Sequence, residues 1–173
     1  MLAAVAFLLQ AVAGAGSLPA RTLTVCDVLA GDPSGLNGKV ISVRGILIAT
    51  EEGTWLSGEC KTHLVTKGLS WGNILWVYVD SSDEAVVRSW RSMSKTLRHL
   101  HADLQKDKVS VTIVGQIETR KSMDEAVYKM PYGWTKVGFG HQGAAPAEIN
   151  VLSVQGVNVQ GRGTEVQRKA HNE

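Results

Sequence analysis

The sequence predicts a mostly β domain with one main helix, in which five strands curl into a closed sheet and the helix lies between the third and fourth strands. Several short segments alternate apolar and polar residues, as half-buried strands do. One longer segment instead repeats apolar residues every three or four positions, which is typical of an amphipathic helix. The length of 173 residues allows a single domain with a tail.

The overall composition is that of an ordinary globular protein. Hydrophobic residues make up 44% of the chain and charged residues 20%, which disfavours a disordered chain, a fibre or a protein with several membrane spans. Eighteen Lys and Arg against sixteen Asp and Glu give a net charge of +2. This excess is too small to identify a nucleic-acid or anionic-membrane binder.

An apolar leader opens the chain. Residues 2–20 carry no charge, and an apolar run at 2–13 ends in small residues, which is the outline of a signal peptide. The run is shorter than the roughly 20 residues that span a bilayer, so we favour cleavage after Ala15 over an uncleaved anchor. The missing Lys or Arg after Met1 suggests a start codon further upstream. We expect 1–20 to be signal peptide and linker, and the mature protein to be periplasmic or secreted, with no stable membrane span.

The chain has two cysteines, Cys26 and Cys60. Lipidation of Cys26 is disfavoured, because it lies beyond Arg21 and not directly after the small residues that end the apolar run. An even number of cysteines in an exported chain indicates a disulfide formed in an oxidising compartment. The alternative is a pair of buried free thiols.

The first half of the predicted domain contains three strands. A short mixed run at 24–29 predicts one or two helical turns, and the Gly, Pro and Asn residues that follow it predict turns. Alternation and β-branched residues predict a first strand at 39–50, with a bulge or sharp bend at Gly45. We expect a second, short strand at 54–57 and a third at 74–80.

The main helix follows the third strand. Ser81 and Glu84 predict a capping box at its start, and Asp83 adds negative charge to the first turn. An apolar stripe with spacings of four and three indicates the face that packs on the sheet. The residues of this stripe are Val86, Trp90, Met93, Leu97, Leu100 and Leu104.

Two more strands complete the predicted sheet. Residues 109–119 alternate around a central Gly115, so we expect a bent strand like the one around Gly45, in the same curved sheet. A long excursion over 120–147 follows. The last strand is expected at 148–159.

This order of three strands, a helix and two strands, with glycine-bent first and fourth strands, resembles the OB-fold, a five-stranded Greek-key barrel. The segment VCDVLAGDPSGLNGKVISVRG is similar to the start of small bacterial OB-fold proteins, and WLSGEC and GFGHQGAAPAE are similar to exported bacterial proteins of unknown function. The resemblance implies an OB-fold-like domain over 21–160, followed by a flexible polar tail over 161–173. It implies no specific activity, because OB-folds bind oligonucleotides, oligosaccharides or proteins.

Motifs that could carry catalysis or hold a metal have ordinary structural interpretations. The glycines of GFGHQG fit GxGxxG, but a β-type run follows them instead of a helix, which disfavours a dinucleotide site. His99 and His101 point to different sides of the predicted helix, and Cys60 with His63 supplies two ligands where a closed zinc site has four. The sequence contains no nucleophile elbow, HExxH or CxxC. We expect no enzyme, no cofactor and no metal.

The excursion over 120–147 carries the candidate ligand site, because it combines aromatic rings, cations and glycines. In the OB-fold this loop and the loop between strands one and two rim the binding face, where rings stack on bases or sugars. The alternative is that these aromatic side chains plug the barrel, as we expect for Trp76 and Trp90. The candidate ligand-binding residues, from the excursion and from strands one and two, are Arg44, Trp55, Lys61, Tyr132, Trp134, Lys136 and His141.

The sequence therefore predicts a monomeric, exported binding protein whose ligand is an oligosaccharide or an envelope protein. Such a protein with a charge of +2 meets these partners more often than nucleic acid, and the salt-dependent phosphate contribution to binding would be small. One alternative is a structural or protein-interaction module without a small ligand. A less favoured alternative is a nucleic-acid-binding OB domain.

Overall fold

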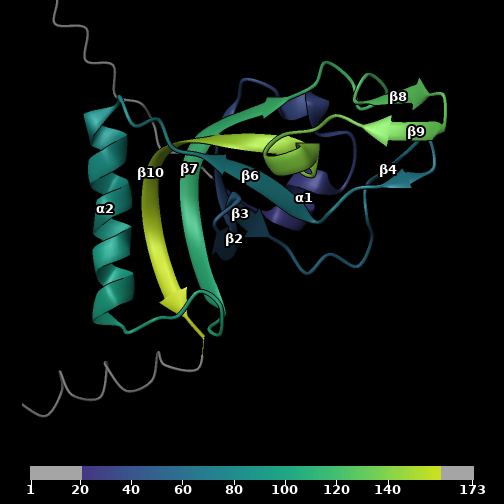
Figure 1. Cartoon of the computed structure of the whole chain (residues 1–173). Coiled ribbons are helices and arrows are strands. Elements are labelled where there is room, and N and C mark those ends of the chain that lie inside the picture. Colours follow the sequence, from purple (N-terminus) through teal and green to yellow (C-terminus); the bar gives the residue numbers. More distant parts are fainter. Residues whose placement is uncertain (1–20, 161–173) are drawn as a thin grey trace, which may run out of the picture.

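The structure is a computed structural model that describes residues 21–160. The predicted signal peptide at 1–20 and the predicted tail at 161–173 lie outside the described residues and stay predictions. The described part is mostly β with one main helix, as the sequence predicts (Figure 1).

A six-stranded sheet forms the body of the molecule. Its pairing order is β1-β2-β3-β6-β10-β7, and β2 also pairs with β7, so the sheet closes in a ring. Strand β6 pairs with β10 in parallel, and the pairs β2–β3, β3–β6, β7–β10 and β2–β7 are antiparallel. The strands are β1 (Thr22–Thr24), β2 (Val40–Thr50), β3 (Gly53–Ser57), β6 (Ile74–Tyr78), β7 (Val109–Thr119) and β10 (Ala147–Val159).

All five predicted strands are present, with small differences at their ends, and so are the predicted short helical turns. The predicted helical turns at 24–29 form α1 (Val25–Leu29), and the stretch predicted as turns after it contains a 3-10 turn, η1 (Pro33–Leu36). The sequence missed β1, which is too short to show a periodicity. It adds to the sheet because it pairs in parallel with β2, with Leu23 opposite Val43.

Strand β2 closes the ring by pairing with two strands at once. Residues 40–46 pair with β7 and residues 46–50 pair with β3. Gly45 lies where the partners change, but the register through it is continuous, so β2, which is described throughout, has no bulge there. The bulges lie in β10 instead, at 151–153 and 154–156.

The mid-strand glycines are required by the close approach of neighbouring segments. A Cβ atom at Gly45 would lie 2.8 Å from Val25 Cγ2 and 3.0 Å from the Ser57 carbonyl oxygen. A Cβ atom at Gly115 would lie 2.5 Å from the Asn150 carbonyl oxygen. Contacts this short are repulsive, so a larger residue at either position would push the strands apart.

The main helix, α2 (Glu84–His99), lies along β10 (Figure 1). Its Val86, Met93 and Leu97 are buried in the core that fills the ring. The helix ends earlier than its predicted stripe, because His101 has a positive φ of 49°. The last two residues of the stripe still pack against the core from beyond the helix. No helix within residues 21–160 is long and apolar enough to cross a membrane.

The predicted capping box at the start of α2 is wrong. The N-cap is Asp83, whose Oδ1 accepts hydrogen bonds from the backbone N–H groups of Ala85 at 2.8 Å and Val86 at 3.2 Å. A carboxylate can accept both bonds and also carries the negative charge that a helix start favours. Asp83 therefore takes the role that the sequence assigned to Ser81 with Glu84.

The excursion over 120–147 is more ordered than the predicted long loop. Strands β8 and β9 form a hairpin that projects beyond the ring (Figure 1). A second small core, formed by Trp71, Met123, Ala126 and Val127, anchors the excursion. The elements of the excursion are β8 (Val127–Met130), β9 (Gly133–Lys136) and the 3-10 turn η2 (His141–Gly143). A separate two-stranded pair, β4 (Val65–Thr66) with β5 (Leu69–Ser70), contacts the hairpin through β5 and β9.

The predicted disulfide between Cys26 and Cys60 is confirmed. It joins α1 to the segment after β3, with a Cα–Cα distance of 5.3 Å. Gly58 packs against the bridge, since a Cβ atom there would lie 3.0 Å from Cys26 Sγ and 3.2 Å from Cys60 Sγ. The bridge therefore fixes α1 against the end of β3.

Removing the disulfide should destabilise the domain strongly. In Cys26→Ser/Cys60→Ser the unfolded chain regains the freedom of a loop closed over 34 residues, and we expect the free energy of unfolding to fall by about 3 to 4 kcal/mol. Urea denaturation of the oxidised wild type, the reduced wild type and the double variant measures this loss. The reduced wild type and the double variant should have the same urea midpoint. Equal midpoints for all three would contradict a stabilising bridge.

The close approach at Gly115 predicts a cost for even one extra methyl group. We expect Gly115→Ala to lower the free energy of unfolding by about 1 to 3 kcal/mol, because the added atom meets backbone that cannot move away freely. Gly35→Ala is the control, since nothing lies within 4 Å of a Cβ atom there. Urea denaturation compares the two variants, and equal losses would show that the contact at Gly115 does not constrain the sheet.

Candidate functional site

The outer face of the ring carries a row of four side chains from four neighbouring strands. Trp55 on β3 is paired with Trp76 on β6. Trp76 is paired with Glu148 on β10, and Glu148 with Glu118 on β7. Paired residues point to the same face of a sheet, and the adjacent positions, such as Leu75, are buried in the core. We call Trp55, Trp76, Glu148 and Glu118 the outer row.

The two tryptophans of the outer row contact each other edge to face. Their ring centroids are 5.1 Å apart and their planes make an angle of 80°. Trp76 is half-buried, whereas Trp55 is only 9% exposed and its buried Nε1 has no hydrogen-bond partner within residues 21–160. Buried indole N–H groups usually have a partner. Because this nitrogen is buried, the surface of the outer row does not present it to a ligand.

Two loops enclose the ring of Trp76. Gly53 is the first residue of β3, directly after the turn that follows β2, and Gly140 lies in the loop that follows β9. A Cβ atom at either glycine would overlap the Trp76 ring. Both glycines also have positive φ, 145° and 71°, which side chains disfavour. The glycines of GFGHQG thus shape a turn against a tryptophan.

The same two loops meet through a pair of titratable side chains. His141 Nε2 lies 3.7 Å from Glu52 Oε1, and both side chains are exposed. The contact is an ion pair only when His141 is protonated. These residues form the rim of the outer row.

The other end of the outer row carries two carboxylates that face each other across β10 and β7. Burial raises the pKa of Glu148, and the negative charge of Glu118 raises it further. Asn150 Nδ2 donates a hydrogen bond to Glu118 Oε2 at 3.3 Å. Like charges directly opposite each other are destabilising, so this end of the row favours a ligand that donates hydrogen bonds or carries positive charge.

The outer row therefore combines an aromatic ring with hydrogen-bond acceptors. The Trp76 ring offers an apolar surface, and the adjacent carboxylates accept hydrogen bonds from hydroxyl or amino groups. Tyr78, which is 49% exposed and paired with Asn150, extends the surface along β6. This combination suits a flat ligand with one apolar face and many donors.

Two of the predicted ligand-binding residues belong to this site. Trp55 is in the outer row and His141 is on its rim. The expectation that Trp76 fills the interior is wrong, because it lies on the outer face. The alternation in ILWVYVD contains this information, since the buried Leu75 and Val77 leave Trp76 and Tyr78 to point outward. Trp90 packs against the core, as expected.

Three other predicted residues lie on the β8–β9 hairpin and not at the outer row. Tyr132 is fully exposed at the hairpin turn. The Lys67 ammonium lies over the Trp134 ring at 5.3 Å, and the Lys136 ammonium lies over the Trp71 ring at 5.1 Å. Trp134 and Lys136 thus help to attach the hairpin to the second core.

The two remaining predicted residues are also apart from the outer row. Lys61 is exposed beside the disulfide, and within residues 21–160 its side chain makes no hydrogen bond or ion pair with the other candidates. Arg44 is paired with Thr112 on β7 and lines a separate hollow on the sheet. The sequence placed these seven residues on one surface because it could not show which part of the curved sheet each strand segment occupies.

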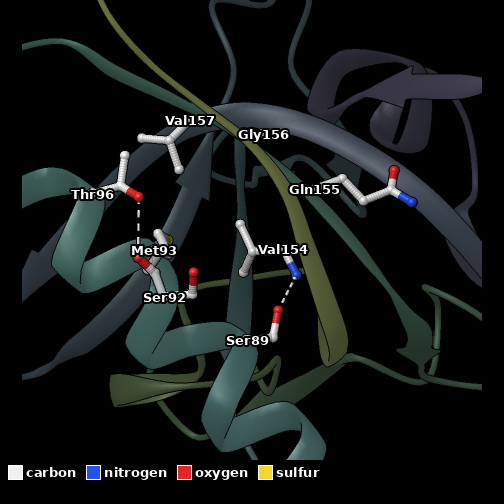
Figure 2. Close-up of a pocket in the computed structure, with 8 residues that line it drawn as sticks. All are labelled: Ser89, Ser92, Met93, Thr96, Val154, Gln155, Gly156 and Val157. Atoms are coloured by element: carbon white, nitrogen blue, oxygen red, sulfur yellow. Dashed lines mark hydrogen bonds between the residues drawn. The ribbon is translucent and has the colours of Figure 1, made fainter.

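A groove between α2 and β10 has a volume of about 260 Å³ (Figure 2). Ser89 Oγ accepts a hydrogen bond from the backbone N–H of Val154 at 2.8 Å, and Thr96 Oγ1 donates one to the Ser92 carbonyl at 3.1 Å. Two of its hydroxyl groups therefore already bind backbone, and no titratable side chain lines the groove. We give the outer row more weight as a ligand site.

Comparison with protein-family models, with curated proteins and with solved structures finds no match to this chain. Within residues 21–160, no group of three or more His, Cys, Asp or Glu side chains is arranged to hold a metal ion. The chemistry of the outer row is therefore inferred from this chain's own residues.

The raised pKa of Glu148 predicts how stability depends on pH. Because protonated Glu148 is favoured in the folded chain, it contributes fully to the free energy of unfolding at pH values below the pKa that Glu148 has in the unfolded chain. This contribution is lost as the pH rises through the higher pKa of the folded chain. Gln does not ionise, so Glu148→Gln does not lose this stability as the pH rises. Relative to the wild type, we therefore expect Glu148→Gln to be more stable at about pH 7 than at about pH 3, as urea denaturation at both pH values would show.

The matched control for this prediction is Glu118→Gln. It removes the neighbouring charge and should lower the pKa of Glu148, which weakens the pH dependence without abolishing it, because burial is the larger cause. A stability difference for Glu148→Gln that does not change with pH would contradict the raised pKa.

Proposed function

We propose that this chain is an exported, monomeric, OB-fold-like binding module whose outer row binds an oligosaccharide. The observation that carries the proposal is the half-buried Trp76, which lies between Trp55 and Glu148 on the outer face and is enclosed by two loops. The disulfide fits an oxidising compartment, the periplasm or the cell exterior.

The sheet topology supports an OB-fold-like assignment. The ring order is β2-β3-β6-β10-β7, and α2 lies between the third and fourth of these strands in the sequence. An OB-fold binds its ligands on the face of strands two and three, between the loops that follow strands one and four. The corresponding parts of this chain are β3, β6, the turn before Gly53 and the excursion over 120–147, which supply the two tryptophans of the outer row and its rim, whereas Glu148 and Glu118 lie on the adjoining strands β10 and β7.

The charges near the outer row favour a sugar over a nucleic acid. Nucleic-acid surfaces combine stacking rings with cations that neutralise phosphates. The outer row instead contains Glu118 and Glu148, and Glu52 lies on its rim. A sugar ring presents C–H groups to the tryptophan and hydroxyl groups to the carboxylates, so it satisfies both halves of the row.

The β8–β9 hairpin favours a second candidate function, binding of an envelope protein. Its turn residue Tyr132 is fully exposed, and Tyr128, Met130 and Trp134 are each more than two-fifths exposed. Exposed aromatic and Met side chains are common at protein interfaces. This surface is separate from the outer row, so the two candidates can be tested with different variants.

Trp76→Ala should weaken oligosaccharide binding by about tenfold or more, because the loss of one stacking ring removes about 1 to 3 kcal/mol. Isothermal titration calorimetry with a panel of neutral oligosaccharides measures the change. Trp134→Ala is the control, since Trp134 is a tryptophan of the hairpin, away from the outer row, and is exposed. It should bind like the wild type.

Two results would contradict the proposed function. One is wild-type protein that binds none of the panel but binds oligonucleotides, which would favour the nucleic-acid alternative. The other is binding that Trp134→Ala weakens and Trp76→Ala leaves unchanged, which would move the ligand site to the hairpin. Circular dichroism of each variant verifies that the fold is retained.

A further inference from the structure

The hollow that Arg44 lines is polar and lies on the outer face of the sheet, over β2, β7 and β10. Its volume is about 390 Å³. Sites for small ligands have volumes in this range. Arg44 on β2 is paired with Thr112 on β7, and Thr112 with Gly156 on β10. Two residues further along β7 and β10, Ser110 is paired with Asn158, and both lie on this same outer face. Residues of three strands therefore point into one hollow.

The charge of this hollow is opposite to that of the outer row. The side chain of Arg44 makes no hydrogen bond or ion pair within residues 21–160, and no Asp or Glu among them lines the hollow. The adjoining surface contains Glu59, but Lys108 Nζ already binds its carboxylate at 2.6 Å. An unpaired guanidinium offers several N–H donors in a plane, which match the two oxygens of a carboxylate or phosphate.

The polar groups around Arg44 are also free to bind a ligand. The side chains of Ser110, Thr112 and Asn158 make no hydrogen bond within the described chain, unlike the Ser89 and Thr96 hydroxyls of the α2–β10 groove. Gly156 leaves space above Thr112, because the atom nearest to a Cβ placed there is Thr112 Oγ1, at 3.8 Å. A side chain at position 156 would cover this hydroxyl.

We propose that this hollow is an oxyanion site, in which Arg44 holds a carboxylate or phosphate group of a small ligand and the Ser110 and Thr112 hydroxyls donate further hydrogen bonds. Hydrogen bonds to an ionised acceptor are stronger than neutral ones. The site does not depend on the proposed function of the outer row, since the two lie on different strand segments and have opposite charge.

Isothermal titration calorimetry of the wild type at low salt, with inorganic phosphate in one arm and glucuronate in the other, tests the proposal. We expect binding of at least one anion, and the stronger arm identifies the oxyanion. Arg44→Gln should weaken that binding at least about tenfold. Ser110→Ala/Thr112→Val, which keeps Arg44, should weaken it severalfold.

The control is Arg91→Gln, which removes an arginine from α2 that is also exposed and should leave the affinity unchanged. Trp76→Ala should also leave it unchanged, which separates this site from the outer row. The proposal is overturned if the wild type binds neither anion, or if Arg91→Gln weakens binding as much as Arg44→Gln. If Arg44→Gln does not fold, unchanged binding by Ser110→Ala/Thr112→Val overturns it.

Discussion

The constraint on which the rest of the structure depends is the double pairing of β2. One half of this strand bonds to β7 and the other half to β3, so the sheet closes on itself. Such closure brings backbone segments into contact, which is why Gly45 faces α1 and the end of β3, and why Gly115 faces β10. The core and the outer face are then the two sides of one curved sheet, and α2 covers the edge of β10 beyond its short parallel pairing with β6.

Closure also decides which side chains become neighbours on the outside. Strands β3, β6, β10 and β7 are far apart in the sequence, yet their register aligns two tryptophans with two carboxylates in a single row. Gly53 at the start of β3 and Gly140 in the loop after β9 both pack against the same tryptophan. Rigid strands hold the row in position, whereas the rim is formed by loops.

The sequence predicted the strands, the helix and the disulfide, because alternation, amphipathic spacing and cysteine count are local signals. It missed β1, which has three residues, and it misplaced the helix cap, since Ser81 and Asp83 are both good caps and only the backbone decides between them. Three of the four residues of the outer row escaped prediction: Trp76 was expected inside the barrel, and the two carboxylates were missed for another reason. Glu118 and Glu148 look like ordinary solvated charges until strand pairing places them opposite each other.

The two outward surfaces of this sheet differ in charge because they use different segments of the same strands. On β7, Glu118 lies at one end and Ser110 and Thr112 at the other, and on β10 Glu148 and Asn158 are separated in the same way. A long strand that turns around a ring thus presents its two halves to different directions. An acidic aromatic surface and a hollow with an unpaired arginine can therefore coexist on a domain whose net charge is only +2. The net charge averages over surfaces of opposite character, which is why it gave no indication of either one.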